Sequence, residues 1–356
     1  MKIDIDADIR KAKTIPSKFY HSLKIYKKLK TLFARSWQFI GDANLLENNN
    51  VHPGILLDGM VDEPYLLTKD KGKIRCLSNV CTHRGNILCS ESCESKTLVC
   101  GYHGRQFEID GSMKFMPEFE NVTNFPNKED NLPVIEMESW KNLIFITNEK
   151  KCNLSELIAP MAKRLDWLPV GEFQYKPELS RTYKVNANWA LYCDNYLEGF
   201  HIPFVHKGLN KELEYENYST QGIDNTVLQI GIGKDGENAF DIPHDHEDYG
   251  KNIAAYYFFL FPNMMFNFYP WGLSINVVKP KSPEYTEIDY FSYVWKEELM
   301  DKGAGADLDK VELEDEDIVE SVQKGVKSNF YDRGRYSPKR EIGVHYFHSL
   351  LQKYYK

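Results

Sequence analysis

The spacing of hydrophobic positions changes twice along the chain, and each change predicts a different kind of structure. Between residues 11 and 34, apolar positions recur at near-helical spacing, which predicts an N-terminal helix. From residue 37 to about 148, the pattern becomes short apolar runs separated by Gly, Asp and Asn, which predicts a small antiparallel β domain. The runs are WQFIG, GILLDG, PYLLTKD, KIRCLSNV, RQFEID and LIFITN.

After residue 150 the pattern becomes mixed. It predicts helices near 154–168 and 187–200, strands through Val278 and over 289–295, and a C-terminal helix. Residues 253–278 carry no charge over a length that could cross a bilayer, but Pro262 and Pro270 interrupt them. We therefore expect two buried strands joined by a Pro-Asn turn, no membrane span, and an α+β chain divided at 1–36, 37–150 and 151–356.

Composition narrows the classes of partner and compartment. The 356 residues carry a formal net charge of -8, which argues against nucleic-acid binding because phosphate contacts need a basic face. The first residues lack the apolar core of a secretory signal. Seven cysteines, several of them beside histidines, suggest metal ligands in a reducing compartment, so a cytoplasmic location is expected.

The first candidate site lies in the stretch CTHRGNILCSESCESKTLVCGYH. Cys81 and His83 form a C-x-H pair, Cys100 and His103 form a C-x-x-H pair, and sixteen residues separate the two pairs. Two thiolates with two imidazoles fit either a structural zinc or a Rieske [2Fe–2S] centre. The local spacing leaves both open.

The second candidate site lies in NWALYCDNYLEGFHIPFVH. On a continuous helix, Leu191, Asp194, Glu198 and His201 would share one face. Pro203 is expected to end that helix, so that His206 in the following turn can approach His201. Two neighbouring histidines need one carboxylate more to complete a facial triad of the non-heme iron type.

The acidic stretch ELEDEDIVESVQKGV offers that carboxylate. Asp315 is in helical phase with Val319, Val322 and Val326, whereas Glu314 and Glu316 are rotated by about 100° and Asp317 by about 160°. An acid in an apolar stripe is unfavourable unless it is paired or metal-bound. Asp315 is therefore the expected third ligand, with Asp317 the alternative if the helix begins later, and four solvated acids the other interpretation.

The chain resembles the Rieske non-heme iron oxygenases of the α-subunit type. The resemblance covers nearly the whole chain, and the two motifs occur in the order typical of that family. The resemblance implies that Cys81, His83, Cys100 and His103 hold a [2Fe–2S] cluster in a Rieske domain at 37–150. It implies a catalytic domain at 151–356, with an antiparallel sheet covered by helices in the helix-grip arrangement, and residues 1–36 packed on it. The mononuclear Fe(II) would be held by His201, His206 and Asp315.

The resemblance also bears on the substrate. Glu198 stands where most ring-hydroxylating members have Asp, and this is similar to the branch that oxidises choline, carnitine and related betaines. The aromatic residues of 256–271 suit a cage for a trimethylammonium group, and equally a flat aromatic substrate. We expect a terminal oxygenase that hydroxylates or demethylates a quaternary amine, with aromatic ring hydroxylation as the alternative. The role of Asp194 stays open.

Family behaviour further implies that Glu198 bridges His103 of a neighbouring subunit and His201, within a homotrimer. The chain has neither a dinucleotide-binding G-x-G-x-x-G nor a ferredoxin-type cysteine run, so electrons for O₂ reduction would come from a separate flavin- or NAD(P)H-dependent reductase, possibly with a ferredoxin. A non-catalytic zinc-stabilised binding protein would explain the first motif but not the inward acids. No role is expected for Cys76, Cys89, Cys93, Cys152 and Cys193, and packing roles are expected for His345 and His348.

Overall fold

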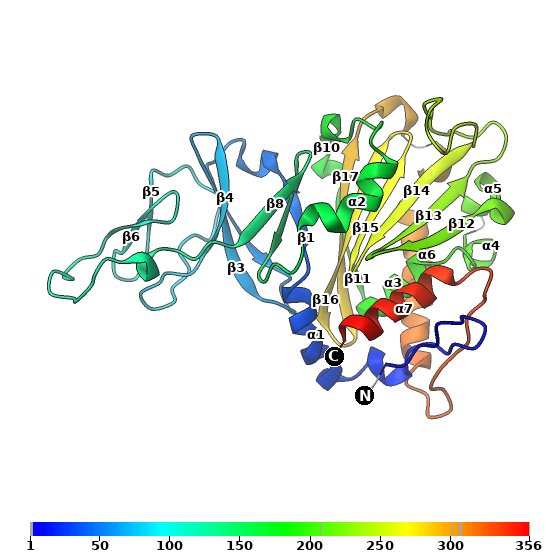
Figure 1. Ribbon diagram of the computed structural model, residues 1–356, viewed down its shortest axis with the longest axis horizontal. Helices are drawn as coiled ribbons and strands as arrows, with labels where there is room; N and C mark the ends of the chain where they lie inside the picture. Colours follow the sequence, from blue (N-terminus) through cyan, green and yellow to red (C-terminus); the bar gives the residue numbers. More distant parts are fainter. Residues whose placement is uncertain (1–2, 207, 301, 306–307, 356) are drawn as a thin grey trace. The chain divides into compact units, whose positions relative to one another are not determined.

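The computed structural model describes residues 3–206, 208–300, 302–305 and 308–355. The chain forms two compact units, Phe33–Leu154 and a larger one made of Met1–Leu32 with Ser155–Lys356 (Figure 1). Each unit has its own sheet structure and is described by itself.

The smaller unit, described throughout, contains three small antiparallel sheets, with strand orders β1-β9-β8, β2-β3-β4 and β5-β6-β7. Six strands lie on the apolar runs of the sequence, while the short β5 and β7 and the polar β8 had no such signal. The strands are β1 Gln38–Asp42, β2 Val51–Leu56, β3 Glu63–Asp70, β4 Lys73–Ser78, β5 Thr97–Val99, β6 Gln106–Glu108, β7 Met113–Phe115, β8 Glu136–Trp140 and β9 Leu143–Thr147.

The core of this unit extends into the loops that carry the first motif. Cys81 and Cys100 are buried in one hydrophobic cluster with residues from the strands, including Leu66, Leu77 and Phe107. Apolar packing therefore holds both loops against the sheets.

The larger unit is built on an eight-stranded antiparallel sheet of order β10-β17-β16-β15-β14-β13-β12, with β11 also paired to β17. Strands β14 and β15 and the first seven residues of β16 are almost completely buried, which explains why these residues carry no charge. The strands are β10 Gln174–Tyr175, β11 Arg181–Val185, β12 Ser219–Ile223, β13 Thr226–Ile232, β14 Ile253–Leu260, β15 Met264–Tyr269, β16 Gly272–Ser282 and β17 Tyr285–Val294.

The expectation of two strands in 253–278 was wrong, because the stretch forms parts of three. The chain reverses at Phe261–Asn263, as expected from the Pro-Asn pair, and again after Tyr269, where Pro270 and Trp271 form a second turn.

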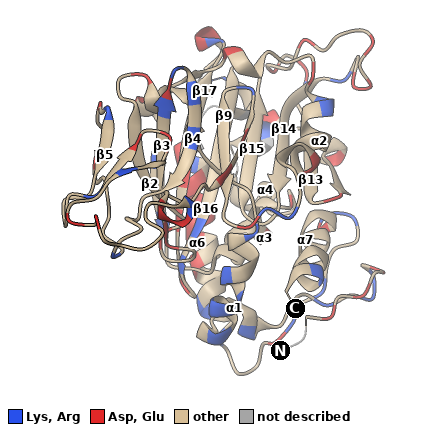
Figure 2. Ribbon diagram, turned by 60° about the vertical axis from the view of Figure 1, so that its left-hand side comes forward, with Lys and Arg blue, Asp and Glu red and all other residues tan. Residues whose placement is uncertain are grey.

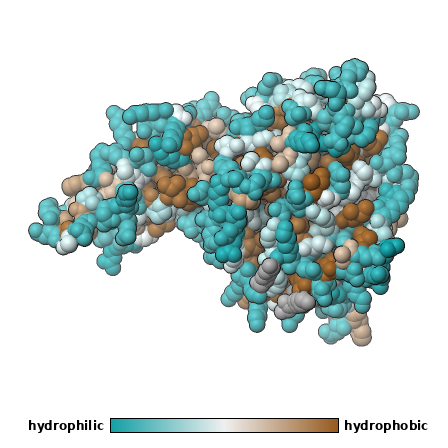
Figure 3. Space-filling model, viewed as in Figure 1, coloured by the Kyte–Doolittle hydropathy of each residue, from teal (hydrophilic) through white to brown (hydrophobic). Residues whose placement is uncertain are grey.

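No helix among the described residues has the length and hydropathy that a membrane span requires. The face seen in Figure 3 is mostly hydrophilic, with scattered hydrophobic residues.

Helices α3 and α7 pack on one face of this sheet, and α6 packs on α3 (Figure 1). Trp189 of α3 and Phe259 of β14 both make edge-on ring contacts with Phe347 of α7. The helices are α1 Leu23–Ala34, α2 Leu154–Arg164, α3 Trp189–Tyr196, α4 Ile202–Val205, α5 Leu209–Glu212, α6 Leu308–Gly325 and α7 Ile342–Tyr354. Short 3₁₀ turns lie at Ser17–Tyr20, Ala43–Leu46, Lys128–Asp130, Val170–Glu172, Pro177–Leu179, Tyr215–Asn217, Glu297–Leu299 and Gly303–Gly305.

The N-terminal helix is shorter than the sequence pattern predicted. It begins at Leu23, because Pro16 lies in extended backbone and is followed by a single 3₁₀ turn over Ser17–Tyr20. Figure 2 shows the lysines of α1 and the acidic residues along α6.

The predicted helix over 187–200 was also too long. Helix α3 ends at Tyr196, and the carboxylate of Glu198 accepts hydrogen bonds from the amides of Phe200 and His201. This side chain thus takes up backbone donors beyond the helix end. Pro203 lies in the first turn of α4, where proline is tolerated, and does not terminate the preceding helix.

Candidate functional site

The two loops of the first motif have the same backbone geometry. In each loop the cysteine carbonyl accepts a hydrogen bond from a glycine amide four residues later, and the cysteine amide donates to the carbonyl five residues later. Each glycine has a positive φ, 73° and 71° respectively, which favours glycine there. The bonds are Gly85 N to Cys81 O (2.9 Å), Cys81 N to Asn86 O (2.8 Å), Gly104 N to Cys100 O (3.0 Å) and Cys100 N to Arg105 O (2.8 Å).

These matched loops bring the four motif side chains together. The ring centroids of His83 and His103 are 4.7 Å apart, and Cys81 and Cys100 are buried beside each other in the core. The Nδ1 atom of His103 is buried without a hydrogen-bond partner. A buried ring nitrogen with no partner suits a metal ligand, so the four residues fit a metal cluster.

The two thiols differ in acidity. Burial raises the pKa of Cys81. Burial acts in the same direction on Cys100, but the amides of Tyr102 and His103 donate to its sulfur and lower its pKa on balance. Amide donors stabilise a thiolate, the form that binds metal.

Two of the remaining cysteines, Cys89 and Cys93, pack against the hydrophobic cluster that contains Cys81 and Cys100. The Sγ atoms of Cys89 and Cys93 are 3.8 Å apart, and all seven cysteines are free thiols. Burial raises the pKa of Cys76 to about 12.

The second motif forms a compact group with a distant carboxylate. The ligand atoms of His201, His206 and Asp315 lie within 4.8 Å of one another, and no other group of this kind occurs among the described residues. Asp315 Oδ1 is 3.0 Å from His206 Nε2 and 3.5 Å from His201 Nε2. The histidines flank the single turn of α4, and Asp315 comes from α6.

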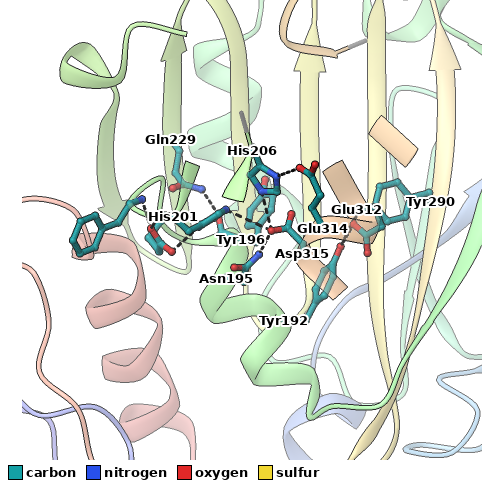
Figure 4. Close-up of polar contacts among 12 residues, drawn as sticks. Tyr192, Asn195, Tyr196, His201, His206, Gln229, Tyr290, Glu312, Glu314 and Asp315 are labelled. Carbon is teal, nitrogen blue, oxygen red and sulfur yellow. Dashed lines mark hydrogen bonds and ion pairs between the residues drawn. The ribbon is translucent and has the colours of Figure 1, made fainter. Parts of the chain in front are cut away.

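The other ring nitrogen of each histidine is held by a carboxylate (Figure 4). Glu198 Oε1 lies 2.6 Å from Nδ1 of His201, and Glu314 Oε2 lies 2.8 Å from Nδ1 of His206. Burial alone would lower the pKa of His206, but Asp315 and Glu314 together raise it. This arrangement directs both Nε2 atoms towards Asp315, as in metal sites with carboxylate-held histidines.

The inward stripe of α6 differs from the sequence expectation. Asp315 faces the histidines and Asp317 is exposed, but Val322 is 42% exposed and was wrongly placed in the stripe. The prediction placed Glu314 about 100° to the side of the stripe and gave it no role, whereas its carboxylate contacts His206. Among the described residues of α6, Glu312, Val319 and Gln323 are buried, and Val326 is buried directly after the helix end.

A cavity of about 110 Å³ adjoins the His201–His206–Asp315 group. Its floor includes a row of residues on neighbouring strands, in the pairing order Gln229, Tyr257, Asn267, Ser274. Of the aromatic stretch singled out in the sequence, only Tyr257 and Tyr269 line the cavity. The sequence did not indicate the other four tyrosines of the wall, Tyr192, Tyr196, Tyr218 and Tyr290.

Glu312 is a lining residue that the sequence reasoning missed. It is 3% exposed, and its Oε2 accepts hydrogen bonds from Tyr192, at 2.7 Å, and Tyr290. Burial raises its pKa to about 8. The sequence contained one sign that Glu312 lies near the site: it precedes Asp315 by three residues, so on a helix the two side chains share one face.

Asp194 points away from the candidate metal ligands. It accepts a hydrogen bond from Tyr20 at 2.7 Å, and its Oδ1 lies 2.9 Å from Nε2 of His348, which is 1% exposed. Nδ1 of His348 lies 2.6 Å from the Tyr336 hydroxyl. Asp194 and His348 therefore form a buried polar contact between α3 and α7.

Comparisons with known proteins match both parts of the chain. Residues 36–126 match the Rieske [2Fe-2S] domain, and residues 166–356 match the ring hydroxylating alpha subunit catalytic domain. Chloroplastic choline monooxygenase of Arabidopsis thaliana is 32% identical, covering 98% of this chain and 85% of the relative. The carnitine monooxygenase oxygenase subunit of Escherichia coli K12 is 30% identical, covering 98% and 96%.

Solved structures show the same fold. A quaternary ammonium Rieske monooxygenase superposes with a TM-score of 0.82 at 25% identity, covering 100% of this chain and 99% of the other. A naphthalene 1,2-dioxygenase superposes with a TM-score of 0.71 at 17% identity, covering 100% and 95%, and supports the fold alone.

These domains imply a Rieske [2Fe–2S] cluster, a mononuclear iron and a separate electron-transfer partner. The expected mixture of helices and antiparallel sheet is confirmed. The chain belongs to the Rieske non-heme iron oxygenases, as an α subunit with a cluster domain and a catalytic domain.

Proposed function

We propose that this chain is the terminal oxygenase of a monooxygenase system that hydroxylates or demethylates a small quaternary amine. The observation that carries the proposal is the His201–His206–Asp315 group beside a cavity walled by six tyrosines. None of the described lining residues is Lys or Arg, so an aromatic acid would find no basic partner there. Relatives of this chain are a choline and a carnitine monooxygenase.

The proposed cluster ligands are Cys81, His83, Cys100 and His103, supported by the matched loops and the unpartnered Nδ1 of His103. The proposed iron ligands are His201, His206 and Asp315, supported by their mutual distances. When bound, the cluster supplies single electrons, and the iron supplies O₂ activation next to the substrate.

The protein's own groups prepare this site. Glu198 and Glu314 accept the Nδ1 protons of the two histidines, so that the Nε2 atoms are the ring positions that would bind the iron. Asn195 donates to Asp315 Oδ1 at 2.6 Å and restrains that carboxylate. The tyrosines limit water in the cavity and leave room for a small substrate.

Glu198 is also the proposed electron-transfer bridge in a homotrimer, linking His201 to His103 of the partner subunit. Support comes from its contact with His201 and from a solved relative described in terms of inter-subunit electron transfer. The electron donor would be a flavin- or NAD(P)H-dependent reductase, possibly with a ferredoxin. The free thiols suit the reducing cytoplasm that we propose as its location.

The proposed domain roles follow the same division. Residues 37–150 carry the cluster, residues 151–356 carry the iron, and residues 1–36 pack on the catalytic part. The hydrogen bond from Tyr20 to Asp194 supports that packing.

Oxygen uptake with a surrogate reductase tests the proposal. Choline, carnitine, glycine betaine and a panel of aromatic acids are compared, and products are identified by mass spectrometry. We expect substrate-dependent uptake and an oxidised or demethylated product with a quaternary amine, and none with the His201→Ala control. Hydroxylated products from the aromatic acids alone would instead establish the ring-hydroxylating alternative.

A further inference from the structure

Two thiols outside the proposed cluster ligands lie next to each other on one exposed loop. The Sγ atoms of Cys89 and Cys93 are 3.8 Å apart, and both side chains are partly buried. The three residues between them, Ser90, Glu91 and Ser92, are exposed, so small molecules in solution can reach the pair. Among the described residues, no third side chain joins the two thiols to form a possible metal site.

The backbone at both thiols is anchored to buried residues. The side chain of Asn79, which is 3% exposed, donates to the carbonyl of Cys89 at 2.8 Å and accepts from its amide at 3.0 Å. Cys93 exchanges two backbone hydrogen bonds with the buried Val51 of β2, at 3.0 and 3.1 Å. Both ends of the segment 89–93 are therefore fixed, and the two sulfur atoms need little further ordering to meet.

The thiol protons are arranged so that one sulfur faces the other. Sγ of Cys89 donates to the carbonyl oxygen of Glu91 at 2.9 Å. Since the Cys89 proton is engaged there, the contact between the sulfurs is a hydrogen bond from the Cys93 thiol to Sγ of Cys89. An S–S bond of about 2.0 Å requires the sulfurs to approach by about 1.8 Å, which rotation about the Cα–Cβ bonds supplies.

The surroundings suit a disulfide that opens and closes. Both side chains pack against the hydrophobic cluster that contains Cys81 and Cys100, and a disulfide has no polar hydrogen and no charge to desolvate there. Only three residues separate the two cysteines, so the bond closes a short ring and gains little from constraining the unfolded chain. Partly exposed disulfides of this kind are the easily reduced ones.

We propose that Cys89 and Cys93 form a site of reversible oxidation, closed to a disulfide by small-molecule disulfides of the glutathione class and reopened by the corresponding thiol. Cys81 and Cys100 are 3% and 2% exposed, so the oxidant reaches the exposed pair and not the proposed cluster ligands. The site is independent of the substrate of the catalytic domain.

The reaction is thiol–disulfide exchange in two steps. One protein thiolate attacks the small disulfide, which forms a mixed disulfide and releases one small thiol. The second protein thiolate then attacks the protein sulfur of the mixed disulfide, which forms the bond between Cys89 and Cys93 and releases the other small thiol. Two electrons and two protons thus pass from the protein to two molecules of small thiol.

Mass spectrometry of the holoenzyme in glutathione buffers tests this inference. Cleavage after Arg84 and Lys96 gives the peptide 85–96, which contains Cys89 and Cys93 and none of the proposed cluster ligands. The protein is equilibrated without O₂, slightly above neutral pH, at increasing proportions of oxidised glutathione. It is then quenched with acid, alkylated with iodoacetamide and digested without reduction.

We expect the peptide to change from the doubly alkylated to the internally bonded form, and to return when reduced glutathione is restored. Two small thiols are released per disulfide, so the change follows the ratio of oxidised glutathione to the square of reduced glutathione. An increase of about 100-fold in this ratio should convert the peptide from mostly dithiol to mostly disulfide. The visible absorption of the cluster should stay constant throughout.

Two variants serve as controls. Cys152→Ser removes another partly buried thiol and should leave the conversion unchanged. Cys93→Ser leaves Cys89 without its partner, so the peptide should carry bound glutathione instead of an internal bond.

The wild-type series is decisive by itself. A peptide that remains doubly alkylated at the most oxidising ratio overturns the inference, as does wild-type protein that accumulates bound glutathione without the internal bond. Loss of the cluster absorption before the disulfide forms also overturns it, because the oxidant would then reach the ligands first.

Discussion

Replacing Glu314 should weaken iron binding although the residue is not a proposed ligand. Its Oε2 lies 2.8 Å from Nδ1 of the buried His206, and its side chain is 32% exposed. Glu314→Ala removes both the charge and the hydrogen bond, so the imidazole loses the contact that directs Nε2 towards Asp315. Glu314→Gln keeps an acceptor for the Nδ1 proton and removes only the charge.

The magnitude follows from the role of such contacts in metal sites. Loss of a carboxylate that orients a metal-bound histidine lowers metal affinity by about 10- to 100-fold, or about 1.4–2.7 kcal/mol. Because Glu314 is partly exposed, solvent screens its charge. The loss of iron affinity in Glu314→Gln should therefore be smaller than the lower end of that range. Glu314→Ala should fall within it.

Anaerobic competition titration of Fe(II) against a chromophoric chelator measures these affinities. It is done above neutral pH, where protons compete less with the metal for the imidazoles. Asp317→Ala is the matched control, since this acid lies on the same helix with an exposed side chain and should leave affinity unchanged. Glu314→Ala with wild-type affinity would refute the reasoning, as would an equal loss in Asp317→Ala.

Three further changes test other contacts. Cys89→Ser and Cys93→Ser should each leave the visible absorption of the cluster intact, and bleaching in either would contradict the ligand assignment. Glu198→Gln should retain both metals but slow reoxidation of the pre-reduced cluster by orders of magnitude in rapid mixing with O₂ and substrate. A wild-type rate would exclude the bridge. Asp130→Asn should destabilise the cluster domain by about 3–5 kcal/mol in urea unfolding, because it leaves the 2% exposed Arg105 without its 2.7 Å ion pair. A change below about 1 kcal/mol would show that this pair is dispensable.

Features encoded over short stretches were visible in the sequence. The two Cys–His pairs occupy tight loops, and His201 and His206 flank one helical turn, so spacing alone brings each pair together. Six strands of the smaller unit were equally clear, because the apolar residues of each lie in one continuous segment, whereas β5, β7 and β8 gave no such signal. These local patterns were sufficient to indicate two metal sites and the α+β class.

The ends of the helices and the choice among neighbouring acids were decided by tertiary structure. Helix α3 ends where the Glu198 side chain takes up the amides of Phe200 and His201, a competition that periodicity does not record. On α6, a sequence defines the angular spacing of residues but not which face turns inward. The turned-in face includes Glu312, which had no apolar signature.

The cavity depended on tertiary structure most of all. Asp315 and Glu314 lie more than a hundred residues from His206, and the tyrosines of the wall come from α3, the sheet and the segment before β12. Sequence by itself determined which residue types were available for metal binding, because ligand chemistry and short spacing are local properties. Only the folded sheet and helices decided which distant side chains share one cavity, since that depends on strand register, on the phase of α6 and on packing across the whole unit.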